Sequence, residues 1–342
     1  MTGVLLINLG TPESPRTKDV RKYLRQFLSD PLVIDINPVA RWFLVNGIIA
    51  PFRAPKSAAL YKKIWMLQGS PLLVYSKKLA QAVGARLGDD YRVELAMRYG
   101  KPSIESAVSF LIRIGVKKIK VLPLYPQYAL SSTQSSIDEV VRVVKKRIFC
   151  EILPPFYNHP GYLTSFAERG KNLLEKMKPD HVLFSYHGLP KRHICKTDAT
   201  GNHCFKTEAC CDQIGEANKN CYRAQCMATT HSLARLLNIS QQNYTMAFQS
   251  RLGRTPWIKP YTDKVLPELV LRGKKSVAVF CPSFVADCLE TLEEVALRNR
   301  DLFLASGGEK LTLVPSLNDS PRWVEAVCEM VRVPDPRVTD PR

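Results

Sequence analysis

One segment combines an apolar run of strand length with the residues that end a strand: His181-Val182-Leu183-Phe184-Ser185-Tyr186-His187-Gly188-Leu189-Pro190. The run predicts a buried strand, the glycine allows a turn, and Pro190 prevents the strand from continuing. In an open α/β sheet, ligands bind at the carboxyl ends of the strands, so His187 is placed for chemistry. The alternative interpretation is a structural turn histidine that is bonded to backbone.

Strands and helices alternate on both sides of this segment. Apolar patterns predict strands at 3–9, 92–97, 118–124, 181–186, 244–248 and 276–281. Helical patterns fall at 18–29, 77–87, 103–114, 137–146, 229–237 and 286–297. This alternation indicates an α/β protein with doubly wound, parallel sheets.

The chain also predicts two related halves. Val4 to Pro12 repeats the strand, turn glycine and proline of Val182 to Pro190, with Leu9 in the place of His187. The Pro154-Pro155 pair suits a stiff connection between domains. We therefore expect an N-terminal domain at 1–150 and a C-terminal domain from 151 to 319, followed by a disordered, proline-rich tail at 333–342.

Composition limits the function classes. The chain has 342 residues, of which 45% are hydrophobic and 23% charged, as in ordinary globular enzymes. Its net charge of +18 comes from dispersed Lys and Arg, and no nucleic-acid-binding signature is present, so we expect no nucleic-acid partner. The longest apolar stretch, Trp42 to Phe52, is too short to span a membrane, and the start lacks a secretory signal. We expect a cytoplasmic protein.

A second candidate site follows the strand that ends at Cys281. Asp287, Glu290 and Glu294 recur at i, i+3 and i+7, which places three carboxylates on one face of the predicted helix. A preference of acids for helix N-termini explains Asp287 better than Glu294. Carboxylates opposite the imidazole of His187 suit transient binding of a divalent metal, or acid–base catalysis.

Six blocks together resemble the ferrochelatase family. They are Leu6 to Pro12, Arg98-Tyr99, Tyr125 to Tyr128, Ser185 to Pro190, Phe248 to Arg251 with Pro256-Trp257, and Ala286 to Leu292. The resemblance implies insertion of ferrous iron into protoporphyrin IX to give protohaem, a lyase step of haem biosynthesis. It also implies the chelatase fold of two flavodoxin-like, Rossmann-like domains, with a C-terminal helix at 320–332 that packs back on the N-terminal domain.

The resemblance also assigns residues. His187 and Glu290 become the metal pair, and Asp287 and Glu294 support the passage of protons or metal. The porphyrin-binding positions are Arg53, Arg98, Tyr99 and Tyr125. The chemistry requires such a set, because two pyrrole N–H protons must leave as Fe²⁺ enters. Cys288 stands where many relatives carry histidine, so any role of that histidine is absent or replaced.

The segment 37–54 is rich in large apolar side chains and has two interpretations. These are Trp42, Phe43, Leu44, Val45, Ile48, Ile49 and Phe52. General burial preferences favour core residues. The flanking Arg41 and Arg53 and the interrupting Gly47 favour a mobile lip over the porphyrin, with peripheral contact at the inner membrane.

Six of the ten cysteines crowd into an insertion at 195–226. The density favours a metal or iron–sulfur centre over disulfides in a cytosolic chain, and the spacing fits tetrahedral zinc poorly. Some bacterial ferrochelatases hold a [2Fe–2S] cluster in such an insertion. This favours a cluster here with the ligands Cys204, Cys210, Cys211 and Cys221, and His203 could replace one of them. Bound zinc and free thiols are the alternatives. The insertion has few large apolar groups, so we expect metal ligation to order it.

Two other functions stay open. One is a chelatase for coproporphyrin or another tetrapyrrole, although the apolar lip favours the more hydrophobic protoporphyrin. The other is a non-catalytic iron–sulfur or haem-binding protein on the same fold. Such a protein would have no need for His187 together with a row of carboxylates.

Overall fold

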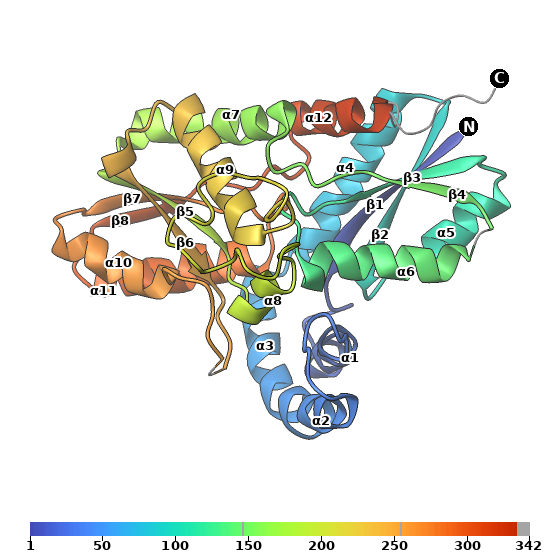
Figure 1. Ribbon diagram of the computed structural model, residues 1–342, viewed down its shortest axis with the longest axis horizontal. Coiled ribbons are helices and arrows are strands. Elements are labelled where there is room, and N and C mark those ends of the chain that lie inside the picture. Colours follow the sequence, from blue (N-terminus) through green and yellow to red (C-terminus); the bar gives the residue numbers. More distant parts are fainter. Residues whose placement is uncertain (146, 254, 334–342) are drawn as a thin grey trace. The chain divides into compact units, whose positions relative to one another are not determined.

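A computed structural model describes the whole chain except residues 146, 254 and 334–342 (Figure 1). The chain divides into two compact units. The first comprises residues 1–124, 131–155 and 318–342, and the second comprises 125–130 and 156–317. Residues 125–130 belong to the second unit, which the expected boundary at residue 150 does not include. The end of the chain lies with the first unit, where the helix at 320–332 was expected. Of the expected tail at 333–342, residues 334–342 lie outside the described residues.

The first unit contains a four-stranded parallel sheet. Its strands are β1 (Thr2–Gly10), β2 (Tyr91–Tyr99), β3 (Lys118–Pro123) and β4 (Phe149–Ile152), in the order β2-β1-β3-β4. β1 lies in the interior of the sheet and is almost wholly buried, which explains its continuous apolar run.

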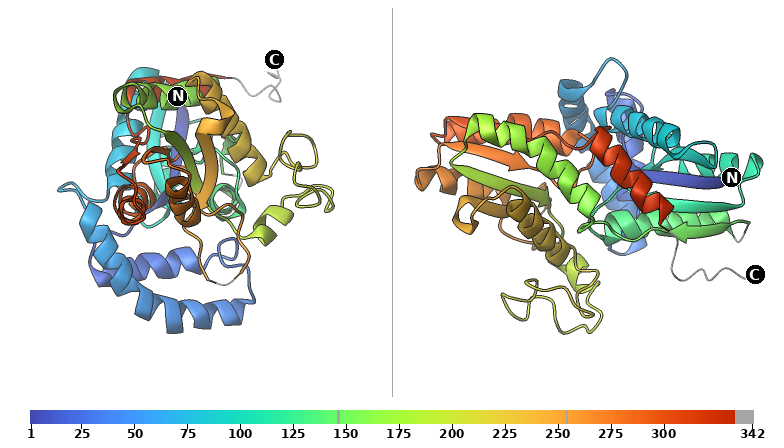
Figure 2. Two further views of the ribbon diagram at one scale, coloured as in Figure 1. Left: turned by 90° about the vertical axis from the view of Figure 1, so that its left-hand side faces the viewer. Right: turned by 90° about the horizontal axis from the view of Figure 1, so that it is seen from above.

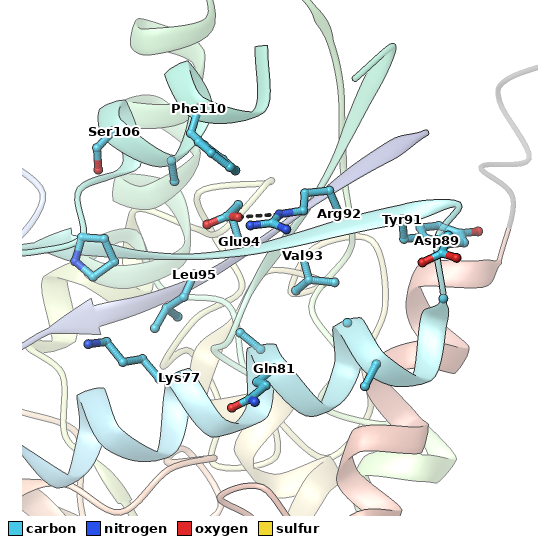
Figure 3. Close-up of a pocket in the computed structure, with 16 residues that line it drawn as sticks. Lys77, Gln81, Asp89, Tyr91, Arg92, Val93, Glu94, Leu95, Ser106 and Phe110 are labelled. Carbon is cyan, nitrogen blue, oxygen red and sulfur yellow. Dashed lines mark hydrogen bonds and ion pairs between the residues drawn. The ribbon is translucent and has the colours of Figure 1, made fainter. Parts of the chain in front are cut away.

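The open edge of β2 borders a cavity of about 690 Å³ between α4 (Pro71–Leu87) and α5 (Ile104–Arg113) (Figure 3). Arg92 and Glu94 form an ion pair of 2.9 Å in this cavity, and Arg92 also stacks over the ring of Phe110. Charged side chains at the edge of a sheet discourage pairing with another chain. None of the predicted site residues lines the cavity.

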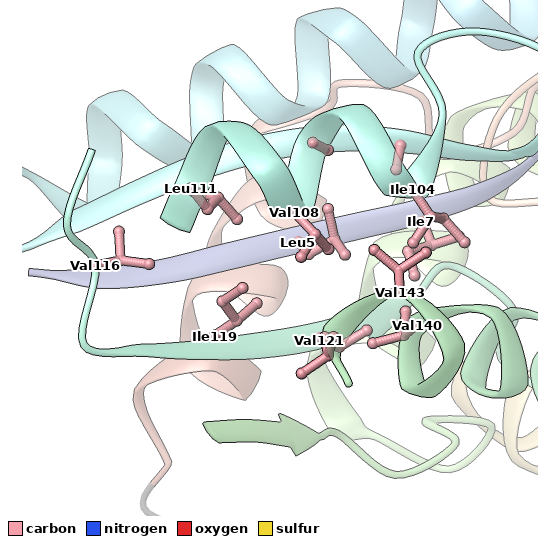
Figure 4. Close-up of a cluster of buried hydrophobic side chains, with 13 residues drawn as sticks. Leu5, Ile7, Ile104, Val108, Leu111, Val116, Ile119, Val121, Val140 and Val143 are labelled. Atoms are coloured by element: carbon pink, nitrogen blue, oxygen red, sulfur yellow. The ribbon is translucent and has the colours of Figure 1, made fainter. Parts of the chain in front are cut away.

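Helices cover both faces of this sheet. A buried cluster that includes Leu5, Val108 and Val140 joins one face to α5 and α6 (Ser135–Val144) (Figure 4). On the other face, α4 packs against the C-terminal helix α12 (Pro321–Arg332), which Arg86 and Glu325 fasten with an ion pair of 3.0 Å. Four more helices of this unit fall between β1 and α4 in the sequence. They are α1 (Thr17–Leu28), α2 (Pro38–Phe43), the π-helix η1 (Leu44–Ile49) and α3 (Ala50–Ile64).

The second unit repeats the arrangement. β5 (His181–His187), β6 (Tyr244–Gln249), β7 (Ser276–Phe280) and β8 (Lys310–Leu313) form a parallel sheet in the order β6-β5-β7-β8. The strand order matches that of the first sheet, as two related halves predict. The predicted parallel, doubly wound sheets are therefore confirmed.

Helices also flank the second sheet. They are α7 (Pro160–Met177), α8 (Lys191–Cys195), α9 (Tyr222–Leu236), η3 (Gln241–Asn243), α10 (Thr262–Leu271), η4 (Leu289–Asn299) and α11 (Arg300–Ala305). A further π-helix, η2 (Leu130–Gln134), begins at the last residue of the 125–130 segment. The segment between α8 and α9 is an irregular loop that extends away from its own sheet (Figure 2). No helix within the described part of the chain is both long and apolar enough to cross a membrane.

Candidate functional site

His187 is the last residue of β5 and is partly exposed, whereas the rest of the strand is buried. Its Nδ1 lies 2.7 Å from the carbonyl oxygen of Gly188. A carbonyl can only accept a hydrogen bond, so Nδ1 is the donor in this contact. The imidazole ring lies 6.3 Å from the ring of Phe284. The strand end therefore holds an imidazole whose orientation is fixed through Nδ1.

Gly188 is required here by close packing. A Cβ atom at this position would lie 2.8 Å from the carbonyl oxygen of Gln249 and 3.2 Å from the ring of Trp257. Only glycine lets the turn after His187 approach the neighbouring strand so closely.

The carboxylates are arranged differently from the prediction. The expected α-helix at 286–297 is a π-helix, η4, that begins at Leu289. Asp287 precedes it, is buried, and accepts hydrogen bonds from Thr291 Oγ1 (3.1 Å) and the Ser316 N–H (3.2 Å). The prediction of three carboxylates on one helical face is therefore wrong for Asp287, which braces the start of the helix.

Glu290 and Glu294 do lie in η4, four residues apart. The wider π turn, with its i→i+5 bonds, brings residues at this spacing close to one face, and π-helices occur often at functional sites. Glu290 is partly exposed. Glu294 accepts hydrogen bonds from the N–H (2.9 Å) and Oγ (2.5 Å) of Ser250, a residue in the left-handed region with φ +66°. Glu294 is thus held in place by Ser250, and both carboxylates are partly exposed.

Cys288 is the N-cap of η4 and is buried. Burial raises the pKa of its thiol well above the ordinary value.

Arg98 and Tyr99, which were predicted to contact porphyrin, converge on one buried carboxylate in the first unit. Asp30 Oδ2 accepts hydrogen bonds from Arg98 Nη2 (2.8 Å), the Tyr99 hydroxyl (2.8 Å) and Ser135 Oγ (2.6 Å). Burial, and then the charge of Asp30, raises the pKa of Tyr99, whose side chain is almost fully enclosed. These contacts fix the end of β2. Arg53 lies exposed on α3, and Tyr125 lies partly exposed after β3.

The apolar segment 37–54 forms α2, η1 and the start of α3. Asn37 caps α2 by accepting from the N–H of Val39 at 3.0 Å. Its apolar side chains separate into three groups, one of which, Leu44 and Ile49, is partly buried. Val45, with Ala50 and Ala54, is buried; the exposed group is Val39, Trp42, Phe43, Ile48 and Phe52. The exposed group favours the lip interpretation, whereas Val45 is a core residue.

The four cysteines that were favoured as ligands are all buried, whereas Cys195 is exposed. The sulfur atoms of Cys210 and Cys211 lie 3.7 Å apart, and Cys221 lies within hydrogen-bonding reach of Cys204 and Cys211. Burial raises the pKa of Cys204 to about 11. Outside residues 146, 254 and 334–342, no group of three or more His, Cys, Asp or Glu side chains is arranged to hold a single metal ion. The four thiols are thus neighbours without a preformed single-ion site.

Hydrogen bonds link distant parts of the cysteine loop. Asp198 accepts from the N–H groups of His203 and Cys204, each at 2.7 Å, and its pKa is lowered by these and neighbouring bonds. Asn218 donates to the carbonyl oxygens of Cys210 (3.0 Å) and Gln213 (2.8 Å). These bonds hold parts of the loop together, and ordering of the loop by metal ligation stays a prediction.

One buried residue of the site was missed. Gln249 ends β6 directly beside His187 in the sheet register and bonds to both β5 and η4. The only signal in the sequence was its place in the block Phe248 to Arg251, to which no role was assigned.

Known proteins match this architecture along its whole length. A family model described as ferrochelatase matches residues 1–333. A ferrochelatase of Coxiella burnetii (strain CbuK_Q154) is 50% identical over 332 residues, covering 96% of this chain and 93% of the relative. A ferrochelatase of Bdellovibrio bacteriovorus is 43% identical over 333 residues, covering 96% of this chain and 98% of the relative.

Solved structures share the fold at low sequence identity. The sirohydrochlorin chelatase SirB from Bacillus subtilis subspecies spizizenii, in complex with cobalt, has a TM-score of 0.54 at 11% identity over 97% of this chain and 94% of that chain. The fold is therefore the chelatase fold. Together with the family match and the extent of the sequence identity, this shows that the chain belongs to the ferrochelatase family, the enzymes that insert ferrous iron into a porphyrin in haem biosynthesis.

Proposed function

We propose that the protein inserts Fe²⁺ into protoporphyrin IX to form protohaem, with His187 and Glu290 as the metal-handling pair. The observation that carries this assignment is the imidazole of His187 at the carboxyl end of β5, orientated by its Nδ1 contact, in the same unit as the carboxylates of η4. A base with a free Nε2 lone pair can accept the pyrrole protons, and a carboxylate binds a divalent cation as it loses water.

Glu290 and Glu294 take different parts in this proposal. Glu290 is partly exposed and binds the incoming ion. Glu294 is held by two hydrogen bonds from Ser250, and Arg298 Nη2 lies 4.0 Å from it, so it provides a fixed negative charge along the same helix. Asp287 acts indirectly, because its bond to Thr291 braces the first turn of η4.

Porphyrin contact involves Arg53 and Tyr125 directly and Arg98 and Tyr99 indirectly. The guanidinium of Arg98 is committed to Asp30, so it shapes the end of β2 rather than meeting a propionate alone. The exposed apolar side chains of α2 and η1 form the lip, which favours protoporphyrin over the more acidic coproporphyrin. The same lip supports peripheral contact of a cytoplasmic enzyme with the inner membrane.

The cysteine loop is the second part of the proposal. Four buried, neighbouring thiols fit the ligand requirement of a [2Fe–2S] cluster, with Cys204, Cys210, Cys211 and Cys221 as ligands. His203 is not a ligand in this proposal, because its Nε2 lies 2.7 Å from the carbonyl oxygen of Cys210. When bound, the cluster would supply sensitivity to oxidation, and a regulatory role follows.

The test of the chelatase function is anaerobic incubation of the purified protein with Fe²⁺ and, separately, protoporphyrin IX or coproporphyrin. The visible spectrum of protohaem should appear with the first porphyrin, and His187→Ala should produce none. Faster product formation with coproporphyrin would replace the proposed substrate. Absence of product with both porphyrins, with tight binding of either, would favour a non-catalytic carrier.

A further inference from the structure

Gln249 is buried at the end of β6, where it pairs in register with His187 of β5. A side-chain amide has two donor hydrogens and an acceptor oxygen, and a buried one must find partners for them. The partners of Gln249 are therefore informative about its role.

The polar groups of Gln249 bond to β5 and the turn after it, to η4, and to Cys281 after β7, whose Sγ lies 3.8 Å from Oε1. Its main-chain oxygen accepts from the Gly188 N–H at 2.8 Å. Its Oε1 accepts from Ser185 Oγ at 2.7 Å, and its Nε2 donates to the carbonyl oxygen of Glu290 at 2.7 Å. One residue thus joins the peptide that follows His187 to the peptide of Glu290.

The geometry leaves this bridge little freedom. The carbonyl of Glu290 can only accept, so the NH₂ group of Gln249 must face it and the oxygen must face Ser185. On the other side, the turn at Gly188 is packed so closely that a single added carbon would meet the Gln249 oxygen at 2.8 Å. Neither β5 nor the first turn of η4 can move alone without breaking a bond.

We propose that Gln249 is a positioning residue that sets the separation between the His187 imidazole and the Glu290 carboxylate, and thereby selects which divalent ion is inserted. The proposal rests on the proposed function, in which these two residues handle the metal. Divalent ions differ in the ligand geometry they prefer, so a fixed pair favours one ion over others.

The test compares Gln249→Met and Gln249→Glu with the parent enzyme and with Gln242→Met, an exposed glutamine on η3. Initial rates with Fe²⁺, Co²⁺ and Zn²⁺ are measured without oxygen, and porphyrin affinity is measured by fluorescence quenching. We expect kcat for Fe²⁺ to fall roughly tenfold to hundredfold, as misplacement of reacting groups by about 1 Å does. Porphyrin affinity should stay unchanged, and the ratio of Fe²⁺ to Zn²⁺ insertion should fall.

Gln249→Glu should lose more activity than Gln249→Met, because its carboxylate would oppose the Glu290 carbonyl. Thermal melting establishes that the variants fold. If neither folds, Ser185→Ala removes one bond to the same amide and should change the metal ratio in the same direction by a smaller factor.

Three results separate the possibilities. An equal fall for all three ions, or a loss of porphyrin affinity, would show that Gln249 only supports the fold. Normal rates and ratios in both variants, with an inactive His187→Ala, would overturn the positioning role alone. Activity retained in His187→Ala would overturn the metal-handling role of His187, on which this proposal rests, whatever Gln249 does.

Discussion

His181 and His187 stand at the two ends of β5 and meet opposite environments. His181 is buried, with Nε2 2.9 Å from Thr245 Oγ1, and burial lowers its pKa to about 4. His187 is partly exposed, and its Nδ1 lies 2.7 Å from the carbonyl oxygen of Gly188. The sequence distinguishes them only by position, since a strand end at the carboxyl edge of a parallel sheet faces ligand and the other end does not.

At His187 we expect His187→Ala to abolish insertion while the protein stays folded, because the ring is not a core group. Glu290→Gln should lower turnover roughly 10²- to 10⁴-fold, the usual contribution of a positioned acid–base or ligand group. Steady-state rates and porphyrin binding, measured together, check both variants. Loss of porphyrin affinity in Glu290→Gln would reassign that residue to substrate contact.

His181 predicts a pH dependence of stability. The unfolded chain binds a proton near pH 6.5, whereas the folded state resists it down to about pH 4. The contribution of His181 to the free energy of unfolding is therefore complete above pH 6.5 and is lost as the pH falls towards 4. Melting curves between these values should fall more steeply for the parent than for His181→Gln, which keeps a hydrogen-bonding side chain for Thr245. Parallel curves would show that His181 titrates normally in the folded protein.

At the scale of elements, the predicted strands of both sheets lie close to the observed β1, β2, β3, β5, β6 and β7. Buried parallel strands carry continuous apolar runs that are easy to recognise. The π-helix η4 was not predicted, because an apolar pattern does not distinguish i→i+4 from i→i+5 bonding. Asp287 was therefore assigned to a helix face that it does not share.

The lip yields an element-scale prediction. Trp42 and Phe43 are 59% and 61% exposed, so changing both to serine should barely alter the melting temperature. The same change should weaken binding of porphyrin and of anionic vesicles, which fluorescence quenching and co-sedimentation measure. Val45→Ala is the matched control in the same segment, since losing buried contacts of a Val costs up to about 1.5–3 kcal/mol. A stability loss of that size in the serine variant would place the two aromatic residues in the core.

The cysteine loop gives a second prediction at the scale of elements. We expect protein purified without oxygen to be brown, with about two irons and two sulfides per chain, and Cys210→Ser or Cys211→Ser to be colourless. Cys150→Ser, in the first unit, should keep the colour. Because burial keeps these thiols protonated, cluster assembly releases protons and should be faster at higher pH. Colourless parent protein that contains one zinc per chain would contradict the cluster and leave the chelatase assignment intact.

For the whole molecule, one buried ion pair fastens the end of the chain to the first sheet. Lys120 Nζ lies 3.3 Å from Glu151 Oε1 and donates to the carbonyl oxygen of Val333 at 2.7 Å. No sequence pattern predicts this contact, because its partners are far apart in the chain and a buried lysine looks like a surface residue.

Lys120→Met should lower the free energy of unfolding by about 3–5 kcal/mol, because it leaves the buried Glu151 without its partner. Replacing both Lys120 and Glu151 by Met should recover much of the loss, and Lys117→Met, on the surface, should have no effect. Urea unfolding measures all three. A double variant no more stable than Lys120→Met would show that the charges themselves are required.

The return of α12 to the first unit has a consequence for synthesis on the ribosome. All four strands of the first sheet are translated before residue 153, but the helix that packs on α4 emerges only after the whole second unit. Trp323, Val327 and Val331 of that helix are fully buried in the finished protein. The nascent chain must therefore carry an uncovered apolar surface while about half of the protein is still being made, and a stalled or truncated chain that ends at residue 317 presents that surface to chaperones and proteases.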